Sequence, residues 1–335
     1  MKILFSGYHN PDFITITEYI EFAIKGSGHE PLIFDNRRFV IPGRIRDRVQ
    51  LLHKIDIKRI NKDLLSRVRR FKPDIFLETG GNRILPETVD SINREGVKTI
   101  LWTTDVPIGF VPILEAAPHY NYVFTCGTEA YDILKGVGVK QLHWLPFACD
   151  PQFHRPVSLS SEETERYGAD ICFIGSYYPN RERILEEIVD FNPGIWGPGW
   201  ERLPDRSPLR RNIKGSKTGP DEWIKIYSAS GIALAIHYKD PENKVPCHQA
   251  SPRVYEVLAC GSLLIVDSQK DVLSIFVPGE DLVVFKDTND LKRLLPYYLE
   301  HKDEARRIAK RGREKVINQH TYKHRVEEML RIVRG

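Results

Sequence analysis

The sequence predicts an α/β protein of two doubly wound domains, each a parallel sheet covered by helices on both faces. Three observations lead to this prediction. The chain has 335 residues, which is long for one ordinary α/β core and enough for two domains. Short apolar runs alternate with amphipathic segments of helical length from end to end. The alternation pauses once, near residue 150, and then begins again.

The first series of apolar runs predicts the strands of an N-terminal domain over residues 1–152. The runs are apolar at consecutive positions, as in strands buried on both faces of a parallel sheet. Between the first two runs, Ile16, Tyr19 and Ala23 recur at helical spacing, which predicts a helix. The expected strands are residues 3–5, 31–34, 75–77, 99–102, 122–124 and 142–145.

The second series predicts a C-terminal domain over residues 153–318. The polar stretch 150–167 is interpreted as a linker with short turns, and the last fifty residues as helices. Two doubly wound domains that face each other would leave a cleft at the carboxyl ends of their sheets, where ligands bind in such folds. The expected strands of this domain are residues 171–174, 195–196, 232–236, 263–266 and 282–285.

Composition restricts the class of partner and the compartment. The 49 basic and 45 acidic residues give a net charge of +4, which suits a small anionic ligand such as a nucleoside diphosphate. No long basic tail or basic-aromatic stripe is present, so we do not expect a nucleic-acid partner. No apolar stretch approaches the ~18 residues of a membrane span, and the N-terminal run is too short for a signal peptide. The five cysteines form no C-x-x-C pair, which favours a reducing, cytoplasmic location.

Residues 251–261 are the most informative segment. Ser251 is a good N-cap, Pro252 suits the first helical position and Gly261 the position after the last turn, so a short helix is expected. Its N-terminus would attract an anion, and Arg253 would add donors suited to a diphosphate. One turn further on, Glu256 could accept hydrogen bonds from ribose hydroxyls. The alternative is a solvent-facing ion pair of Arg253 with Glu256, worth a few tenths of a kcal/mol.

This segment also carries a family resemblance. Arg253, Tyr255, Glu256 and residues 259–261 resemble the C-terminal signature of the CgeB-like (spore maturation protein-like) glycosyltransferases, relatives of the large retaining family with the GT-B fold. The resemblance covers nearly the whole chain. Further matching positions are residues 72–74, 102, 105, 145–147, 150–151, 173–176, 182–183, 196–200, 267, 278–281, 290, 297–299, 320–321 and 325.

The resemblance implies a GT-B enzyme of two facing Rossmann-like domains with an interdomain cleft, whose last helix, residues 319–335, packs back on the N-terminal domain. It implies transfer of a sugar, with retention, from a UDP-, GDP- or TDP-linked donor. Such enzymes generally need no metal, because basic groups and a helix terminus neutralise the leaving diphosphate. The sequence contains no Asp-x-Asp motif, and we expect no metal and no cofactor.

The resemblance also assigns residues to the donor site. Glu256 would bind the ribose, and Arg183 and Arg253 the diphosphate. In the broader retaining family two glutamates eight residues apart line this site; here Glu256 fits the second position, but His248 occupies the first. The other residues expected around the donor are Gly7, Gly175, Ser176, Ile213, Lys214, Ser251 and Tyr255.

Three N-terminal residues are further catalytic candidates, because they follow predicted strands. His9, beside Gly7, could act as a hydrogen-bond donor or base, and the alternative is a solvated loop histidine. Glu78 or Asp105 could orient or deprotonate an acceptor hydroxyl within ~3 Å. The alternatives are a loop charge for Glu78 and a helix N-cap for Asp105. The loop after the first strand lacks G-x-G-x-x-G, so we do not expect dinucleotide binding there.

Two other functions are compatible with the same residues. One is a different nucleotide-sugar enzyme of the same fold, such as an epimerase, which would act on the donor alone. The other is a non-catalytic module that binds a nucleotide or sugar without turnover. No motif identifies the acceptor or the oligomeric state.

Overall fold

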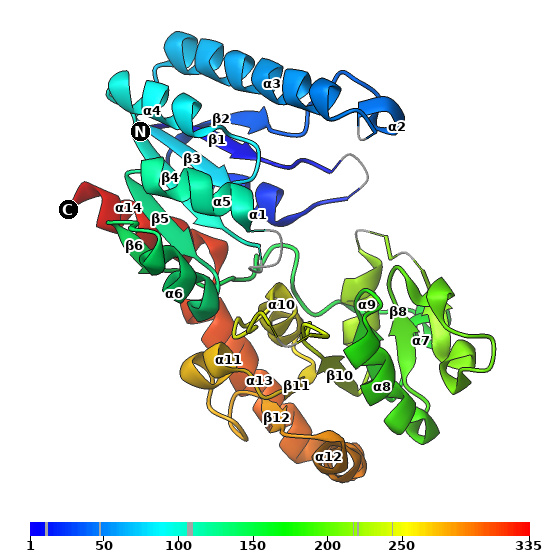
Figure 1. The fold of residues 1–335 in the computed structure, drawn as a ribbon. Coiled ribbons are helices and arrows are strands. Elements are labelled where there is room, and N and C mark those ends of the chain that lie inside the picture. Colours follow the sequence, from blue (N-terminus) through cyan, green and yellow to red (C-terminus); the bar gives the residue numbers. More distant parts are fainter. Residues whose placement is uncertain (11–12, 47, 106–109, 217, 220, 243) are drawn as a thin grey trace. The chain divides into compact units, whose positions relative to one another are not determined.

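The structure is a computed structural model that describes residues 1–10, 13–46, 48–105, 110–216, 218–219, 221–242 and 244–335. The chain divides into two compact units (Figure 1). Unit 1 contains Met1–Pro146 and Tyr322–Gly335, and unit 2 contains Phe147–Thr321. Each unit is a parallel Rossmann-like sheet with helices, as the sequence predicts.

Unit 1 is built on a six-stranded sheet of order β2-β1-β3-β4-β5-β6, in which every neighbouring pair is parallel. The strands are β1 (Lys2–Gly7), β2 (Glu30–Asp35), β3 (Ile75–Thr79), β4 (Lys98–Thr103), β5 (Tyr122–Thr125) and β6 (Leu142–Trp144). The helices are α1 (Ile16–Gly26), α2 (Gly43–Arg46), α3 (Gln50–Phe71), α4 (Pro86–Arg94), α5 (Val111–Ala116), the 3-10 turn η1 (Ala117–His119), α6 (Thr128–Gly136) and α14 (Tyr322–Arg334).

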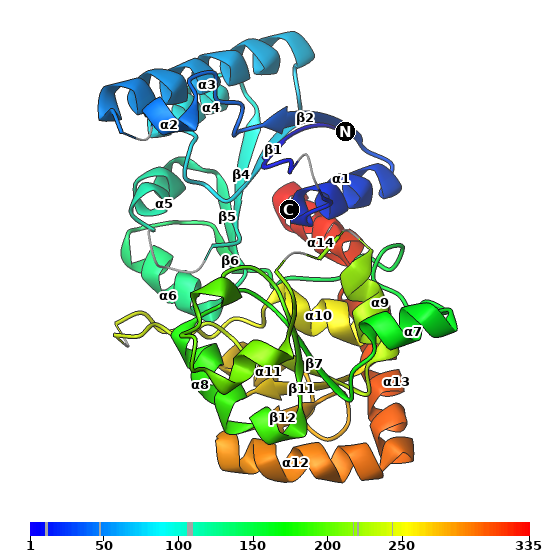
Figure 2. The same cartoon turned by 90° about the vertical axis from the view of Figure 1, so that its right-hand side faces the viewer.

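The last helix of the chain belongs to unit 1. α14 packs on α1, where the rings of Tyr322 and Tyr19 stack with centroids 5.7 Å apart. Arg325 of α14 donates a hydrogen bond of 2.8 Å to the carbonyl oxygen of Pro146. Figure 2 shows α1 and α14 on one side of the sheet and α5 and α6 on the other. The two sides bury the strands on both faces, which explains their continuous apolar sequences.

Unit 2 has a second six-stranded parallel sheet, of order β12-β11-β10-β7-β8-β9. Its strands are β7 (Ile171–Ile174), β8 (Gly194–Trp196), β9 (Ile213–Gly215), β10 (Ile232–Ala235), β11 (Leu263–Asp267) and β12 (Val283–Phe285). Its α-helices are α7 (Ser161–Tyr167), α8 (Pro179–Glu187), α9 (Glu222–Ala229), α10 (Pro252–Ala259), α11 (Lys270–Ile275), α12 (Thr288–Glu300) and α13 (Lys302–Gln319). Three 3-10 turns complete it, η2 (Val189–Phe191), η3 (Trp200–Arg202) and η4 (Pro208–Asn212).

The strand order reverses once in each unit. In unit 1 the chain starts at β1 and builds outward in both directions, so the order reverses between β1 and β3. In unit 2 it reverses between β7 and β10. At such a reversal the two adjoining loops diverge at the carboxyl ends of the strands and leave room for a ligand.

Two predictions about unit 2 were wrong in detail. The polar stretch interpreted as a linker contains helix α7, which begins with a capping box between Ser160 and Glu163. The edge strand β9 was not expected as a strand, because only one of its three residues, Ile213, is apolar.

Candidate functional site

The loops that follow β7 and β10 are joined by a half-buried arginine that the sequence analysis did not single out. Arg181, near the start of α8, donates hydrogen bonds of 2.8 Å to the carbonyl oxygens of Ile236 and Ser176. Burial lowers the pKa of Arg181 to about 10, so the guanidinium is still charged at pH 7. The contact fixes both loops of the strand-order reversal and places a positive charge beneath them.

Glycine is required where the loops after β7 and β8 meet. Gly197 has a φ of +136°, and a Cβ there would lie 2.3 Å from the carbonyl oxygen of Gly175. The same carbonyl accepts a hydrogen bond of 2.9 Å from the Trp200 indole. Gly175, predicted to contact the donor, therefore has a packing role at the base of this loop.

The start of α10 is held by a histidine and an aspartate. His237 lies after β10, and its Nε2 accepts a hydrogen bond of 2.9 Å from the Ser251 backbone N–H. Its Nδ1 lies 2.7 Å from Asp267 at the end of β11. Because Nε2 accepts, the ring proton is on Nδ1 and the imidazole is neutral. Burial raises the pKa of Asp267, but the contacts with His237 and Gln269 outweigh burial and leave that pKa below its usual value.

These contacts change the expected anion site at the helix terminus. Ser251 is the N-cap and Pro252 the first helical residue, as predicted, but the Ser251 side chain makes no capping hydrogen bond. The Ser251 N–H is taken by His237, and the Val254 N–H lies 3.0 Å from the Ser251 carbonyl oxygen. Fewer backbone donors therefore face a ligand than the sequence predicted, and side chains must supply more of the positive charge.

Arg253 and Glu256 form an ion pair at this helix start. Arg253 Nη1 lies 2.8 Å from Glu256 Oε2, with side-chain exposures of 35% and 9%. The guanidinium also lies over the Trp223 ring, 5.3 Å from its centroid. Arg253 and Glu256 therefore form the i, i+3 ion pair of the alternative interpretation, but the Glu256 carboxylate is buried instead of solvent-facing. Glu256 and Trp223 hold the Arg253 charge at the first turn of α10.

A pocket of about 540 Å³ lies at the carboxyl ends of β10, β11 and β12. Arg183 of α8 lines it, together with Lys239 and Lys286. Among the donor residues predicted from the sequence, the described lining includes only Arg183.

The remaining donor candidates of unit 2 lie in different environments. Tyr255 is fully buried, with its ring against Phe276 and His320, so its predicted contact with a nucleotide is wrong. Ile213 and Lys214 lie on the edge strand β9, Ile213 half-buried and Lys214 exposed. His248 precedes α10, and its carbonyl oxygen accepts a hydrogen bond of 3.0 Å from the N–H of Asp271.

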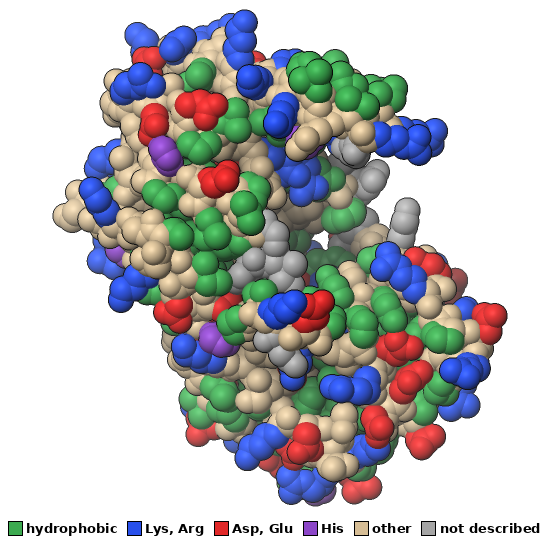
Figure 3. Space-filling view, viewed as in Figure 1, with side chains coloured by type: hydrophobic (Ala, Val, Ile, Leu, Met, Phe, Trp, Pro, Cys, Tyr) green, Lys and Arg blue, Asp and Glu red, His purple; other side chains and the backbone are tan. Residues whose placement is uncertain are grey.

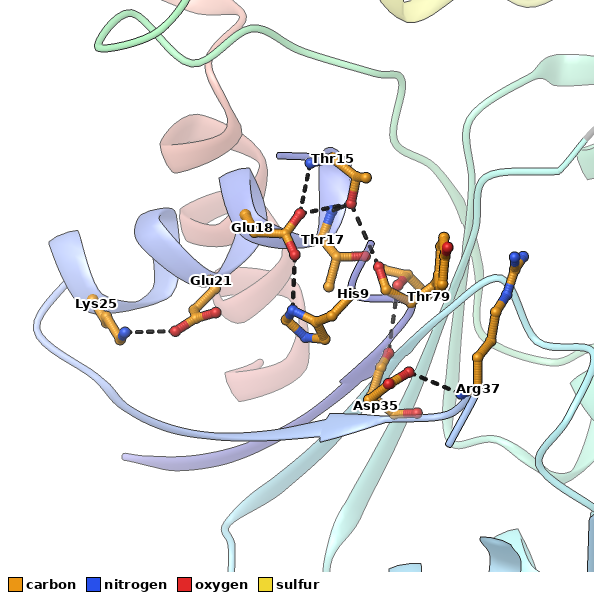
Figure 4. A network of polar contacts seen from close by, with 11 residues as sticks. His9, Thr15, Thr17, Glu18, Glu21, Lys25, Asp35, Arg37 and Thr79 are labelled. Carbon is orange, nitrogen blue, oxygen red and sulfur yellow. Dashed lines mark hydrogen bonds and ion pairs between the residues drawn. The ribbon is translucent and has the colours of Figure 1, made fainter. Parts of the chain in front are cut away.

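In unit 1 the loop after β1 holds a paired histidine (Figure 4). His9 Nδ1 lies 2.8 Å from Glu18 of α1, and this hydrogen bond raises the pKa of His9. Glu18 also accepts hydrogen bonds from the backbone N–H and the hydroxyl of Thr15, at 2.6 and 2.7 Å. His9 is therefore oriented by a carboxylate, unlike a solvated loop histidine. Gly7 precedes it where a Cβ would lie 2.7 Å from Thr17.

Glu78 does not face a ligand. Its side chain is fully buried in β3 and accepts a hydrogen bond from the Tyr120 hydroxyl. Burial raises the pKa of Glu78 to about 8, so the carboxyl is mostly protonated at pH 7. Because the side chain is fully buried, both the predicted role at an acceptor hydroxyl and the alternative of a loop charge are wrong for Glu78.

Asp105 lies in a pocket of about 200 Å³ at the carboxyl ends of β1, β2, β3 and β4. Two arginines, Arg37 and Arg83, line the same pocket. Burial raises the pKa of Asp105, although Arg83 and Arg37 both act in the opposite direction. The N-cap of the following helix α5 is Phe110, so the alternative of an N-cap role for Asp105 is wrong.

Within the described ranges, no group of three or more His, Cys, Asp or Glu side chains is placed to hold a metal ion. No described helix is long and apolar enough to cross a membrane. All five cysteines are free thiols, and only Cys247 is partly exposed.

Comparison with known proteins gives the class of the chain. Residues 181–331 match a family model described as glycosyl transferase-like. Spore protein CgeB of Bacillus subtilis (strain 168) is 20% identical over 256 residues, which are 73% of this chain and 78% of that protein. These matches confirm the resemblance to CgeB-like proteins that the sequence motifs indicated.

Solved structures share the fold over the whole chain. Sucrose-phosphate synthase of Thermosynechococcus elongatus superposes with a TM-score of 0.70 at 12% identity, covering 99% of this chain and 98% of that one. Anabaena HepE in complex with UDP-glucose gives 0.69 at 10% identity, covering 99% of both. AviGT4, a glycosyltransferase of avilamycin A biosynthesis, gives 0.66 at 15% identity, covering 99% and 97%. The fold is therefore GT-B. Together with this fold, the match of residues 181–331 to the glycosyl transferase-like family model supports an enzyme of the glycosyltransferase class.

Proposed function

We propose that the chain transfers a sugar from a nucleoside-diphosphate sugar to an acceptor hydroxyl, with the donor bound by unit 2 and the acceptor by unit 1. The observation that carries the proposal is the arrangement at the β7–β10 reversal. Arg181 joins the two loops, and the Arg253–Glu256 pair lies on a helix start held by His237. The glycosyl transferase-like match begins at Arg181 and includes all of these side chains.

Positive side chains are the proposed substitute for a metal. As the donor bond breaks, charge develops on the leaving diphosphate, and preorganised cations near that charge lower the barrier. The Arg253 guanidinium is held by Glu256 and Trp223 and so needs little reorganisation. We propose that Arg253 contacts the diphosphate and that no metal ion is required. In this arrangement Glu256 positions Arg253, in addition to any contact with the ribose.

The donor is proposed to be linked to UDP. The Anabaena HepE structures with a similar fold contain UDP, UDP with glucose, and UDP-glucose. GDP and TDP are the alternatives to be tested in parallel. Retention of the anomeric configuration is proposed from the resemblance to the retaining family.

The first experiment is a thermal-shift measurement with UDP, GDP and TDP, in the presence of EDTA. A nucleotide at ~100 times its dissociation constant should stabilise the protein by about 2.7 kcal/mol. Arg253→Gln should weaken binding by roughly tenfold or more, the size expected for a lost charge-assisted hydrogen bond. The matched control is Arg293→Gln, since Arg293 also pairs at i, i+3, with Asp290, but on the exposed surface of α12.

The second experiment follows the slow hydrolysis of UDP-glucose by NMR, with water as the acceptor. A retaining enzyme releases the α-anomer first. Failure of all three nucleotides to bind would contradict the donor assignment, and a requirement for added Mg²⁺ would contradict metal independence. Binding without hydrolysis or transfer would instead identify a non-catalytic module.

A further inference from the structure

The pocket at the carboxyl ends of β1 and β3 in unit 1 has an unbalanced positive charge. Arg37 and Arg83 line it, and Asp105 is the one carboxylate among its described lining residues. Within the part of the chain that the structure describes, neither arginine forms an ion pair; Arg83 donates a hydrogen bond of 2.7 Å to the Asn82 side chain. Glu78 is buried in β3 and is not among the described residues that line the pocket. Two guanidinium groups therefore meet one carboxylate.

The lowered pKa of Arg83 agrees with an excess of positive charge at the pocket. Burial is the main cause that lowers the pKa of Arg83, and the like charges of Arg37 and Arg46 lower it further. Glu78 and Asp105 act in the opposite direction but do not restore the usual value. The charges of the two arginines repel each other across the pocket, so an anion bound between them would be attracted by both.

The Arg37 side chain is oriented by an aromatic ring of the pocket lining. The Arg37 guanidinium lies over the Tyr8 ring, 3.9 Å from the centroid. Its backbone N–H donates to Asp35 at 2.9 Å, while Figure 4 shows the side chain directed away from the Asp35 carboxylate. A cation that is already oriented loses less entropy when it binds a phosphate or carboxylate.

Uncharged polar groups surround these cations. Asn36 is 3% exposed, and its Oδ1 has no hydrogen-bond partner among the described residues. Thr15, Thr17 and Thr79 line the same pocket. A buried amide oxygen without a donor is costly, and a hydroxyl of a bound ligand would satisfy it. The pocket thus combines cations for an anionic group with partners for hydroxyls.

We propose that this pocket binds the acceptor through a phosphate or carboxylate group on a molecule the size of a monosaccharide. The proposal rests on the proposed function, because it assigns an acceptor class to unit 1. The volume of about 200 Å³ is below the ~300 Å³ at which pockets for drug-sized ligands begin.

The charge around the pocket supports an anionic ligand. Residues 37–63 contain nine Lys and Arg against three Asp, whereas the net charge of the whole chain is only +4. The rest of the chain is therefore slightly acidic, and this basic segment includes Arg37, which lines the pocket, and Arg46, whose charge acts on Arg83. Figure 3 shows Lys and Arg side chains over the end of unit 1 where α2 lies. Such a field raises the local concentration and the association rate of anions.

The experiment measures binding of three probes to the full chain by calorimetry: glucose 6-phosphate, glucuronate and glucose. We expect at least one anionic sugar to bind roughly tenfold or more tightly than glucose, and more weakly as salt increases. Tighter binding of glucose 6-phosphate would identify a phosphate site, and tighter binding of glucuronate a carboxylate site. Equal affinity for all three probes, or no binding of either anion, would overturn the proposal.

The variants Arg83→Gln and Arg37→Gln should each remove most of the preference for the anion. The control is Arg94→Gln, because Arg94 of α4 is exposed and bonds to its own helix at Asp90 and Ser91. Equal losses in Arg94→Gln and Arg83→Gln would also overturn the proposal. UDP binding is measured on the same samples. If the wild type does not bind UDP, the proposed donor function is contradicted. If the wild type binds UDP but shows no preference for the anionic sugars, only the acceptor proposal is contradicted.

Discussion

Replacing Glu78 with glutamine is expected to stabilise unit 1 near neutral pH. Burial raises the pKa of Glu78 to about 8, from an ordinary value of 4.5 in the unfolded chain. At pH 7 the carboxyl must therefore gain a proton when the chain folds. Glutamine has nearly the same shape, and its amide oxygen can accept the Tyr120 hydrogen bond without gaining a proton.

The magnitude follows from the linkage between proton binding and folding. Between pH 4.5 and 8 the folded state binds more protons at Glu78 than the unfolded state does, so stability falls as pH rises. The slope approaches 1.36 kcal/mol per pH unit, which amounts to about 3 kcal/mol from pH 4.5 to pH 7. The contribution of this carboxyl is fully present below pH 4.5 and is lost as pH rises through 8.

The assay is urea unfolding of the wild type and of Glu78→Gln at pH 5, 6, 7 and 8, followed by tryptophan fluorescence. The two proteins should differ by less than about 1 kcal/mol at pH 5 and by about 3 kcal/mol at pH 7. Tyr120→Phe is the control, because it removes the hydroxyl but keeps the carboxyl, and should destabilise by about 1–3 kcal/mol. A difference between wild type and Glu78→Gln that stays constant with pH would refute the burial of a protonated carboxyl.

Two other substitutions test the donor side of unit 2. Gly197→Ala places a Cβ 2.3 Å from a backbone carbonyl oxygen of the loop after β7, so we expect a lower melting temperature and lost UDP binding. The control is Gly136→Ala in α6, where the added Cβ has no atom within 4 Å and the substitution should be neutral or stabilising. His237→Ala removes the acceptor of the Ser251 N–H and one of the hydrogen bonds to Asp267, and should cost about 1–3 kcal/mol together with UDP affinity. The control is His119→Ala, which breaks a solvent-exposed pair with Asp90 and should cost less than about 1 kcal/mol of stability. Equal losses of stability for the two histidine variants would argue against a role for His237 at the helix start.

The strands were predictable because each is a short run of consecutive apolar residues, a signal that can be read without knowing the rest of the fold. Every apolar run interpreted as a strand is one, since the central strands are buried on both faces and the strands carry few polar residues. The short strand β9 was not predicted because it lies at the sheet edge and includes the exposed Lys214. Helix α7 had a visible signal, Ser160 followed three residues later by Glu163, but its polar composition favoured the linker interpretation.

The contacts of the site were less predictable because they join distant parts of the chain. His237 and Asp267 are 30 residues apart and meet only because β10 and β11 are neighbours in the sheet. Both are among the first polar residues after a buried strand, and that position is the one local signal that could have selected them. Tyr255 shows the opposite error: it is a position of the family signature and was therefore assigned to the donor, yet its side chain is buried in the core against Phe276.

Arg181 and Arg183 show why a motif alone does not choose a ligand-binding residue. Both lie in α8, and residues two apart on an α-helix point in directions about 200° apart. Only one of the two can therefore point to the loops of the sheet, and it is Arg181 that reaches the carbonyl oxygens of Ile236 and Ser176. Arg183 is left exposed on the side of the larger pocket. The sequence resemblance selected Arg183 in the same turn of the helix, but the packing of α8 on its sheet decides that Arg181 is the arginine that joins the two loops.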